Sequence, residues 1–120
     1  MENKIQAGQT LPPVSVVIPA FNEAGHVHEE VTQIVRVLHA HGIVHEIIVV
    51  DDGSQDQTAA RALQAGARVL QHRPNRGYGA SLKTGIIAAR YDAIVITDAD
   101  GTYPAEEIPT LLAQLQTADM

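Results

Sequence analysis

The stretch EIIVVDDGS, residues 46–54, contains the pattern from which the fold is predicted. Its consecutive apolar residues predict a strand that is buried on both faces, as in a parallel sheet. Two carboxylates follow at once, where the strand must leave the core. Ser54 then stands three residues before Gln57, in the spacing of a capping box, so a short helix is expected over residues 57–65. A buried strand followed by a helix is half of a βαβ unit.

The same alternation recurs on both sides of this stretch. The expected strands are 14–19, 46–54, 68–72 and 92–97, and the expected helices are 23–41, 57–65, the later part of 75–90, and 104–116. Four such units predict an α/β fold, with a Rossmann-like, mainly parallel sheet flanked by helices. We expect one domain over residues 14–120, preceded by an N-terminal extension at 1–13. In the last helix the stripe of Ile108, Leu111, Leu112 and Leu115 is expected to be buried.

The composition narrows the classes of function. The net charge of −6 and the pI near 5.3 argue against nucleic acid as the main partner. The absence of cysteine excludes a disulfide framework and a thiolate metal site, which favours a cytoplasmic location. No stretch is apolar for long enough to cross a bilayer. Five of the eight Lys and Arg residues fall between positions 68 and 90, where they form either a local anion site or an ordinary exposed face: Arg68, Arg73, Arg76, Lys83 and Arg90.

Acidic residues follow the second and fourth predicted strands, at the edge where parallel sheets bind ligands. Residues two apart in an extended chain point to the same side, so Asp98 and Asp100 can present oxygens to one cation while Ala99 faces away. Carboxylate oxygens suit Mg²⁺ or Mn²⁺, which also keep positions for water and phosphate. The pair therefore predicts a metal bridge to a diphosphate. Each acid alone is also explained by capping of the next helix or by a turn.

Four motifs in this order and spacing resemble the amino-terminal half of a family-two glycosyltransferase of the GT-A fold. They are VSVVIPAFNEAGHV, EIIVVDDGSQDQT, NRGYGASLKTGI and AIVITDADGTYP, within residues 14–109. The resemblance is strongest to the dolichol-phosphate or polyprenyl-phosphate mannosyl- and glucosyltransferase branch. It implies an inverting transfer of sugar from a UDP- or GDP-linked donor, with Mg²⁺ or Mn²⁺, to an acceptor such as a polyprenyl phosphate.

The resemblance also assigns roles to positions in this sequence. The nucleotide would be bordered by Pro19, Ala20, Phe21, Asn22 and Glu23, and Asp52 would accept a hydrogen bond from its base. Asp51 would point away and serve the structure. Asp98 would lie near the ribose and the metal, next to Ala99, and Asp100 would be the principal metal ligand. That branch often has Gln two residues later as a further ligand, whereas this chain has Thr102.

Positive charge and backbone amides near the third predicted helix extend this expected site. Arg76 and Lys83 could stabilise the departing diphosphate, although ordinary surface positions explain both equally well. The backbone at Gly77 and Gly79 could donate to an anion, because both lie at the start of that helix. Paired histidines, two apart on the first helix, do not face each other, and we do not interpret them as metal ligands.

Two other functions remain open from the residues. Gly77, Gly79 and Leu82 open a helix as G-x-G-x-x-L, which is a partial fingerprint of a dinucleotide-binding domain of an oxidoreductase. The third Gly is missing, and that function leaves Asp100 unexplained. A non-catalytic nucleotide-binding module is the second alternative.

The resemblance further implies an acceptor-binding half, carrying any catalytic base, that would follow Met120. We therefore expect these residues alone to bind the donor without transferring sugar, and the complete protein to work at the inner face of the membrane.

Overall fold

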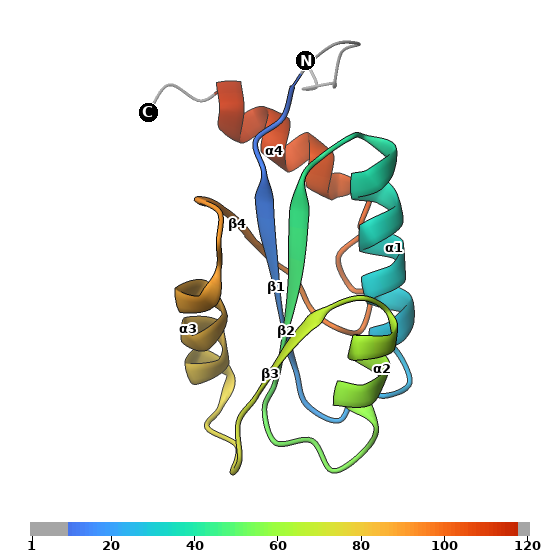
Figure 1. Cartoon of the computed structure of the whole chain (residues 1–120), viewed down its shortest axis with the longest axis vertical. Helices are drawn as coiled ribbons and strands as arrows, with labels where there is room; N and C mark the ends of the chain where they lie inside the picture. Colours follow the sequence, from blue (N-terminus) through green and yellow to red (C-terminus); the bar gives the residue numbers. More distant parts are fainter. Residues whose placement is uncertain (1–9, 118–120) are drawn as a thin grey trace.

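The computed structural model describes residues 10–117, which form a four-stranded parallel sheet with helices on both faces (Figure 1). The order of strands across the sheet is β3-β2-β1-β4. Of the predicted extension at 1–13, only residues 10–13 are described. The predicted domain end at 120 lies outside the described residues. The elements are β1 (Val14–Ala20), α1 (Val27–Ala40), β2 (His45–Asp51), α2 (Thr58–Gln64), β3 (Arg68–Gln71), α3 (Tyr78–Ala88), β4 (Ala93–Ile96) and α4 (Glu107–Thr117).

The predicted order of strands and helices is confirmed, and the differences lie at the ends of elements. Helix α1 begins at Val27 rather than at residue 23, because residues 22–26 form a turn in which Asn22 has a φ of 52°. Helix α4 begins at Glu107 rather than at residue 104, after a turn closed by the bond from its amide to the Pro104 carbonyl (3.1 Å). The chain therefore forms a loop between β1 and α1, and another between β4 and α4.

The predicted capping box at the start of α2 is wrong. Ser54 does not cap the helix, because its hydroxyl accepts the Asn22 amide (2.7 Å) from the neighbouring loop. The N-cap is Gln57, whose side chain makes no capping bond, and the Thr58 amide donates to Oδ1 of Asp56, the residue before the cap (3.0 Å).

The two faces of the sheet are covered differently. Figure 1 shows α3 alone on one side of the sheet and α1 with α2 on the other. On the α1 side, the apolar side chains of β1 and β2 form a continuous core with Val31, Ile34 and Leu38 of the helix. On the α3 side, the helix approaches closely at Gly85, where an added Cβ would lie 2.4 Å from a methyl carbon of Val17. No real side chain tolerates that distance, so glycine sets how near α3 lies to the sheet.

Helix α4 crosses the end of the sheet that carries the amino ends of the strands, against α1 (Figure 1). Half of its predicted stripe is buried, since Ile108 and Leu112 are each 1% exposed. Leu111 and Leu115 are 40% and 45% exposed, so their predicted burial is wrong. A helix that packs at the sheet end buries a narrower strip of its surface than one lying flat on the sheet. Across residues 10–117 we find no helix whose length and hydropathy would let it span a bilayer.

Candidate nucleotide and metal site

The loops that leave β1 and β2 are tied together by hydrogen bonds between backbone amides and side chains. This arrangement requires the left-handed backbone of Asn22, a residue type that tolerates it. The two strand ends therefore form one rigid edge. The bonds are Asn22 N–H to Ser54 Oγ (2.7 Å), Glu23 N–H to Thr58 Oγ1 (2.9 Å), Ala24 N–H to Asp56 Oδ2 (3.2 Å) and Gln55 N–H to Asn22 Oδ1 (2.9 Å).

Asp52 is buried, and groups of the β3–α3 loop donate hydrogen bonds to its carboxylate. Its Oδ1 accepts the Arg76 amide (2.8 Å) and lies 2.8 Å from His72 Nδ1, while its Oδ2 accepts the Gly77 amide (2.9 Å). Burial would raise the pKa of Asp52, but the bonds from Arg76, His72 and Gly77 together hold that pKa below its usual value. Asp52 thus fixes the loop to the sheet. That Asp52 accepts a hydrogen bond from a nucleotide base stays a prediction.

The same contacts change what is expected of the start of α3. The Gly77 amide is bonded to Asp52 and is therefore not free to donate to an external anion, whereas donation by the Gly79 amide stays a prediction. Gly77 has a φ of 100°, a conformation that favours glycine, and this conformation lets the chain enter the helix beside Asp52. Asp51, by contrast, is 2% exposed and accepts the Ser54 amide (3.1 Å) and the Gln71 side chain (3.3 Å). These contacts agree with the structural role expected for Asp51.

His72 is the residue of this edge that sequence reasoning missed. It is 4% exposed, and besides its contact with Asp52 its Nε2 lies 2.8 Å from Thr84 Oγ1 on α3. The imidazole therefore links β2, the loop and α3 in one buried network. The signal in the sequence was a histidine directly after the third strand, opposite an acid directly after the second.

The acids after β4 lie in a different environment. Asp98 and Asp100 are exposed and Ala99 between them is 3% exposed, although β4 ends at Ile96 and Ala99 and Asp100 lie in a turn rather than in the extended chain that was expected. Asp100 Oδ1 accepts the amide (3.0 Å) and hydroxyl (2.5 Å) of Thr102, and these bonds lower the pKa of Asp100. Asp98 has no hydrogen-bond or ion-pair partner within residues 10–117. Thr102 thus orients one carboxylate, and the other is free for a ligand.

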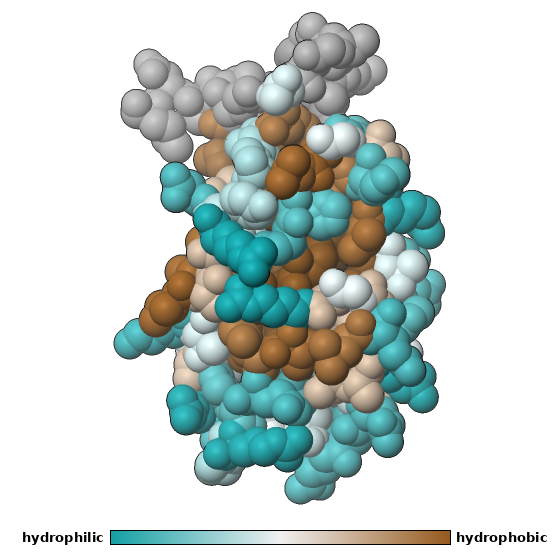
Figure 2. Space-filling view, in the orientation of Figure 1, coloured by the Kyte–Doolittle hydropathy of each residue, from teal (hydrophilic) through white to brown (hydrophobic). Residues whose placement is uncertain are grey.

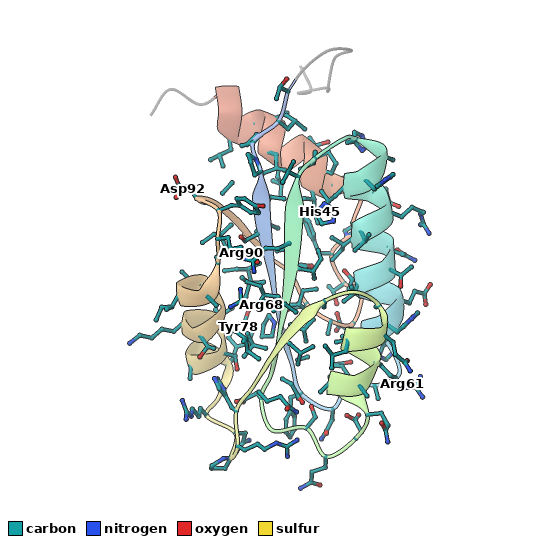
Figure 3. All side chains as sticks on the ribbon, viewed as in Figure 1. His45, Arg61, Arg68, Tyr78, Arg90 and Asp92 are labelled. Atoms are coloured by element: carbon teal, nitrogen blue, oxygen red, sulfur yellow. The ribbon has the colours of Figure 1, made fainter. Side chains whose placement is uncertain are left out.

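The predicted cluster of cations is divided by the fold. Arg68 and Arg90 both approach Glu46 Oε1, at 3.6 and 3.9 Å, toward the amino ends of the strands (Figure 3). They therefore cannot belong to a site at the carboxyl ends. Arg76 and Lys83 are both exposed. Of the cluster, Arg73 lines a cleft of about 660 Å³ at the carboxyl edge.

Two adjoining hollows lie between the loops at this edge. A cleft of about 660 Å³ is lined by Phe21, Arg73, Asn75 and the loop after β2, and a smaller one of about 270 Å³ by Pro19, Ala20, Asp52 and Tyr78. Phe21 borders both and is 50% exposed, and Tyr78, labelled in Figure 3, is 59% exposed. Open aromatic faces beside a cleft suit a planar base. In Figure 2 the carboxyl edge of the sheet is at the lower end of the molecule, and hydrophilic side chains gather there.

A divalent cation fits the β4 edge by the chemistry of its donors. Asp98 and Asp100 supply hard oxygen ligands, and a third carboxylate, Glu30 of α1, has a buried Oε2 without a hydrogen-bond partner. Within residues 10–117, no group of three or more His, Asp or Glu side chains is placed to hold a metal ion. The two aspartates could therefore hold a cation only with further ligands from water or substrate, as Mg²⁺ and Mn²⁺ commonly allow.

The model of the family described as glycosyl transferase family 2 matches residues 15–120, so the chain belongs to that family. A curated relative is the undecaprenyl-phosphate 4-deoxy-4-formamido-L-arabinose transferase of Edwardsiella ictaluri. It is 36% identical over 110 residues, which cover 87% of this chain and 34% of the relative. The chain thus spans about a third of the length of that relative. Membership of this family favours the glycosyltransferase interpretation over a dinucleotide-binding oxidoreductase.

Solved structures place the fold among the GT-A glycosyltransferases. The glucosyl-3-phosphoglycerate synthase of Mycobacterium tuberculosis, in complex with Mn²⁺, UDP and glucosyl-3-phosphoglycerate, has a TM-score of 0.78 at 28% identity. That match covers 97% of this chain and 47% of the synthase. The same enzyme with Mg²⁺ and UDP matches 73% of this chain and 33% of the synthase, with a TM-score of 0.64 at 33% identity. The α/β fold, with its parallel sheet, is therefore confirmed.

Proposed function

We propose that this chain is the donor-binding part of a glycosyltransferase that takes sugar from a nucleoside diphosphate, with UDP as the nucleoside diphosphate. The observation that carries the proposal is the placement at one sheet edge of two different features. One is the cleft bordered by Phe21 and Tyr78, and the other is the exposed pair Asp98 and Asp100. The first suits a base, and the second suits the cation that accompanies a diphosphate.

In this proposal each part of the edge performs one task. The loops after β1 and β2, locked by their mutual bonds, form the floor on which the base lies, and Asp52 holds the β3–α3 loop as its wall. Asp98 and Asp100 hold Mg²⁺ or Mn²⁺, which stabilises the negative charge that develops on the leaving diphosphate. Arg76 and Lys83, both exposed, add positive charge from the α3 side.

The choice of UDP, and of a polyprenyl phosphate as acceptor, is supported by the similar proteins. The mycobacterial synthase was solved with UDP, and the Edwardsiella relative is named for transfer involving undecaprenyl phosphate. A lipid phosphate is already an anionic nucleophile, so its attack would need no strong general base. A membrane-bound acceptor would also bring the complete protein to the membrane surface.

Calorimetry with UDP and with GDP, each with and without manganese, tests the donor site. We expect UDP to bind more tightly than GDP, and more tightly with manganese than without, because the cation offsets the repulsion between the diphosphate and the two aspartates. Binding that does not depend on the metal, or no binding, contradicts the proposal. The acceptor is tested on the longest product that the gene encodes, with radiolabelled donor and either undecaprenyl phosphate or 3-phosphoglycerate. Transfer to 3-phosphoglycerate alone would overturn the lipid assignment.

A further inference from the structure

Glu30 is a buried carboxylate, and one of its oxygens has no hydrogen-bond partner. It lies on α1, is 6% exposed, and its Oε2 makes no hydrogen bond. A charged group that loses its water without gaining a partner is strongly destabilising, so proteins rarely bury one without a reason. Asp51, which is buried as deeply at the end of β2, has its hydrogen-bond donors. Among the described residues, Glu46 Oε1 and Thr97 Oγ1 are also buried without a hydrogen-bond partner, but Glu46 Oε1 lies 3.6 Å from Arg68 and 3.9 Å from Arg90, and Thr97 carries no charge. Glu30 is therefore the buried charge that needs an explanation.

The Glu30 side chain lines a pocket beside the proposed metal ligands. This pocket of about 230 Å³ lies between α1 and the β4–α4 loop, and Asp100, Gly101 and Tyr103 also border it. A Cβ added at Gly101 would lie 3.5 Å from Glu30 Oε1, so the carboxylate reaches the turn that directly follows Asp100. Burial, and after it the charges of Asp100, Glu29 and Asp98, raise the pKa of Glu30. Three carboxylates, those of Glu29, Glu30 and Asp100, border this pocket, and a cation would relieve the repulsion between them.

We propose that Glu30 is a positioning residue for the divalent cation of Asp98 and Asp100, and that its carboxylate accepts a hydrogen bond from a water molecule on that cation. The proposal rests on the proposed function. Direct ligation by Glu30 is not the role assigned, because no three acidic or histidine side chains of the described region are placed around a common metal position. Mg²⁺ and Mn²⁺ retain waters in such sites, and acceptors for those waters tune affinity. A free, buried carboxylate oxygen has the chemistry of such an acceptor.

Manganese binding without nucleotide tests this role, followed by the electron paramagnetic resonance signal of free Mn²⁺. Glu30→Gln keeps the shape of the side chain and removes its charge, and we expect it to weaken Mn²⁺ binding by about 10- to 100-fold, the usual effect of an outer-shell change. Glu106→Gln is the matched control. It removes the same charge from an exposed residue that also raises the pKa of Glu30 but does not line the pocket. We expect it to change the affinity by less than about twofold.

Thermal melting separates this role from a purely structural one. Without metal, Glu30→Gln should melt higher than the parent, because an unpaired buried charge is gone, and manganese should raise its melting temperature less. If the variant does not melt cooperatively, Glu30→Asp, which keeps the charge on a shorter side chain, replaces it, and we then expect weaker manganese binding. Equal manganese affinity in parent and variants overturns the role of Glu30 while leaving the metal site in place. Absence of manganese binding in the parent overturns the proposed metal site, and the role of Glu30 with it.

Discussion

The acids after β2 and the acids after β4 follow similar apolar strands, yet the fold gives them opposite environments. Asp52 is 7% exposed and is contacted by three donors, whereas Asp98 is exposed and has no partner among residues 10–117. The difference follows from strand order. Strand β2 lies beside β3, and the loop after β3 supplies all three donors to Asp52, whereas β4 is at the edge of the described sheet.

This difference teaches that an acid at a strand end is not by itself a ligand. Where neighbouring loops satisfy the carboxylate, its charge organises the protein, and where they do not, its charge is available to something outside. The two pairs should therefore respond to mutation in different ways. Changes after β4 should alter metal binding and spare the fold, and changes after β2 should alter the fold of a loop whether or not metal is present.

The largest effect is expected for Asp100→Asn. This change removes the charge of the proposed principal ligand but keeps a side chain that can accept the bonds from Thr102. Manganese-dependent binding of UDP should be lost, an effect greater than the roughly 10- to 100-fold of an outer-shell change. The melting temperature should barely change, because the side chain is exposed. Calorimetry measures the binding of UDP and manganese, and thermal melting measures the stability. A folded variant with parental manganese affinity would refute the metal assignment.

An intermediate effect is expected for Asp52→Ala. The variant leaves His72 and two backbone amides without their acceptor, so the β3–α3 loop should loosen. We expect UDP binding to weaken by about 1.5 to 3 kcal/mol, the worth of a hydrogen bond to a charged group, with and without manganese. The melting temperature should also fall. Asp92→Asn, an exposed acid outside this edge, is the control. A loss seen only with manganese would place Asp52 with the metal ligands instead.

The smallest effect is expected for Thr102→Val, which removes one hydroxyl and keeps the shape and the backbone amide. The amide still donates to Asp100, so the carboxylate should be held less firmly rather than released. We expect manganese affinity to fall by at most about tenfold, the low end of outer-shell effects. Thr102→Ser, which retains the hydroxyl, should match the parent. If Thr102→Val also matched the parent, the hydroxyl would have no part in orienting Asp100.

The order of strands and helices was predictable from sequence because buried parallel strands and amphipathic helices have distinct periodicities. Contacts between loops were not predictable in the same way. Ser54 has the spacing of a cap, yet it bonds to Asn22 in another loop, and no local pattern reveals that choice. Arg68 and Arg90 lie close in sequence to Arg76, but the fold directs them to Glu46.

The position of the candidate site was predictable, but the contacts between its side chains were not. Topology alone defines the carboxyl edge of the sheet, so the amino-acid sequence is sufficient to locate Asp98 and Asp100 there. Glu30 could not be located in this way, because it lies among the apolar residues of a helix and its proximity to Asp100 depends on how that helix packs. His72 likewise gains its role only from contacts with Asp52 and Thr84.

The close approach of α3 to the sheet at Gly85 has a consequence for attempts to redesign the donor cleft. Thr84, directly before this glycine, holds His72, and the first residues of the same helix carry Tyr78 beside the cleft. A larger residue at position 85 would move α3 away from the sheet. Tyr78, which borders the cleft, would move with the helix although no residue that lines the cleft had been changed. The position of that side of the cleft is thus set by a close contact behind it, at Gly85, where not even a methyl group fits. Engineers who wish to admit a bulkier nucleotide would do better to vary the residues behind α3 than those that face the ligand.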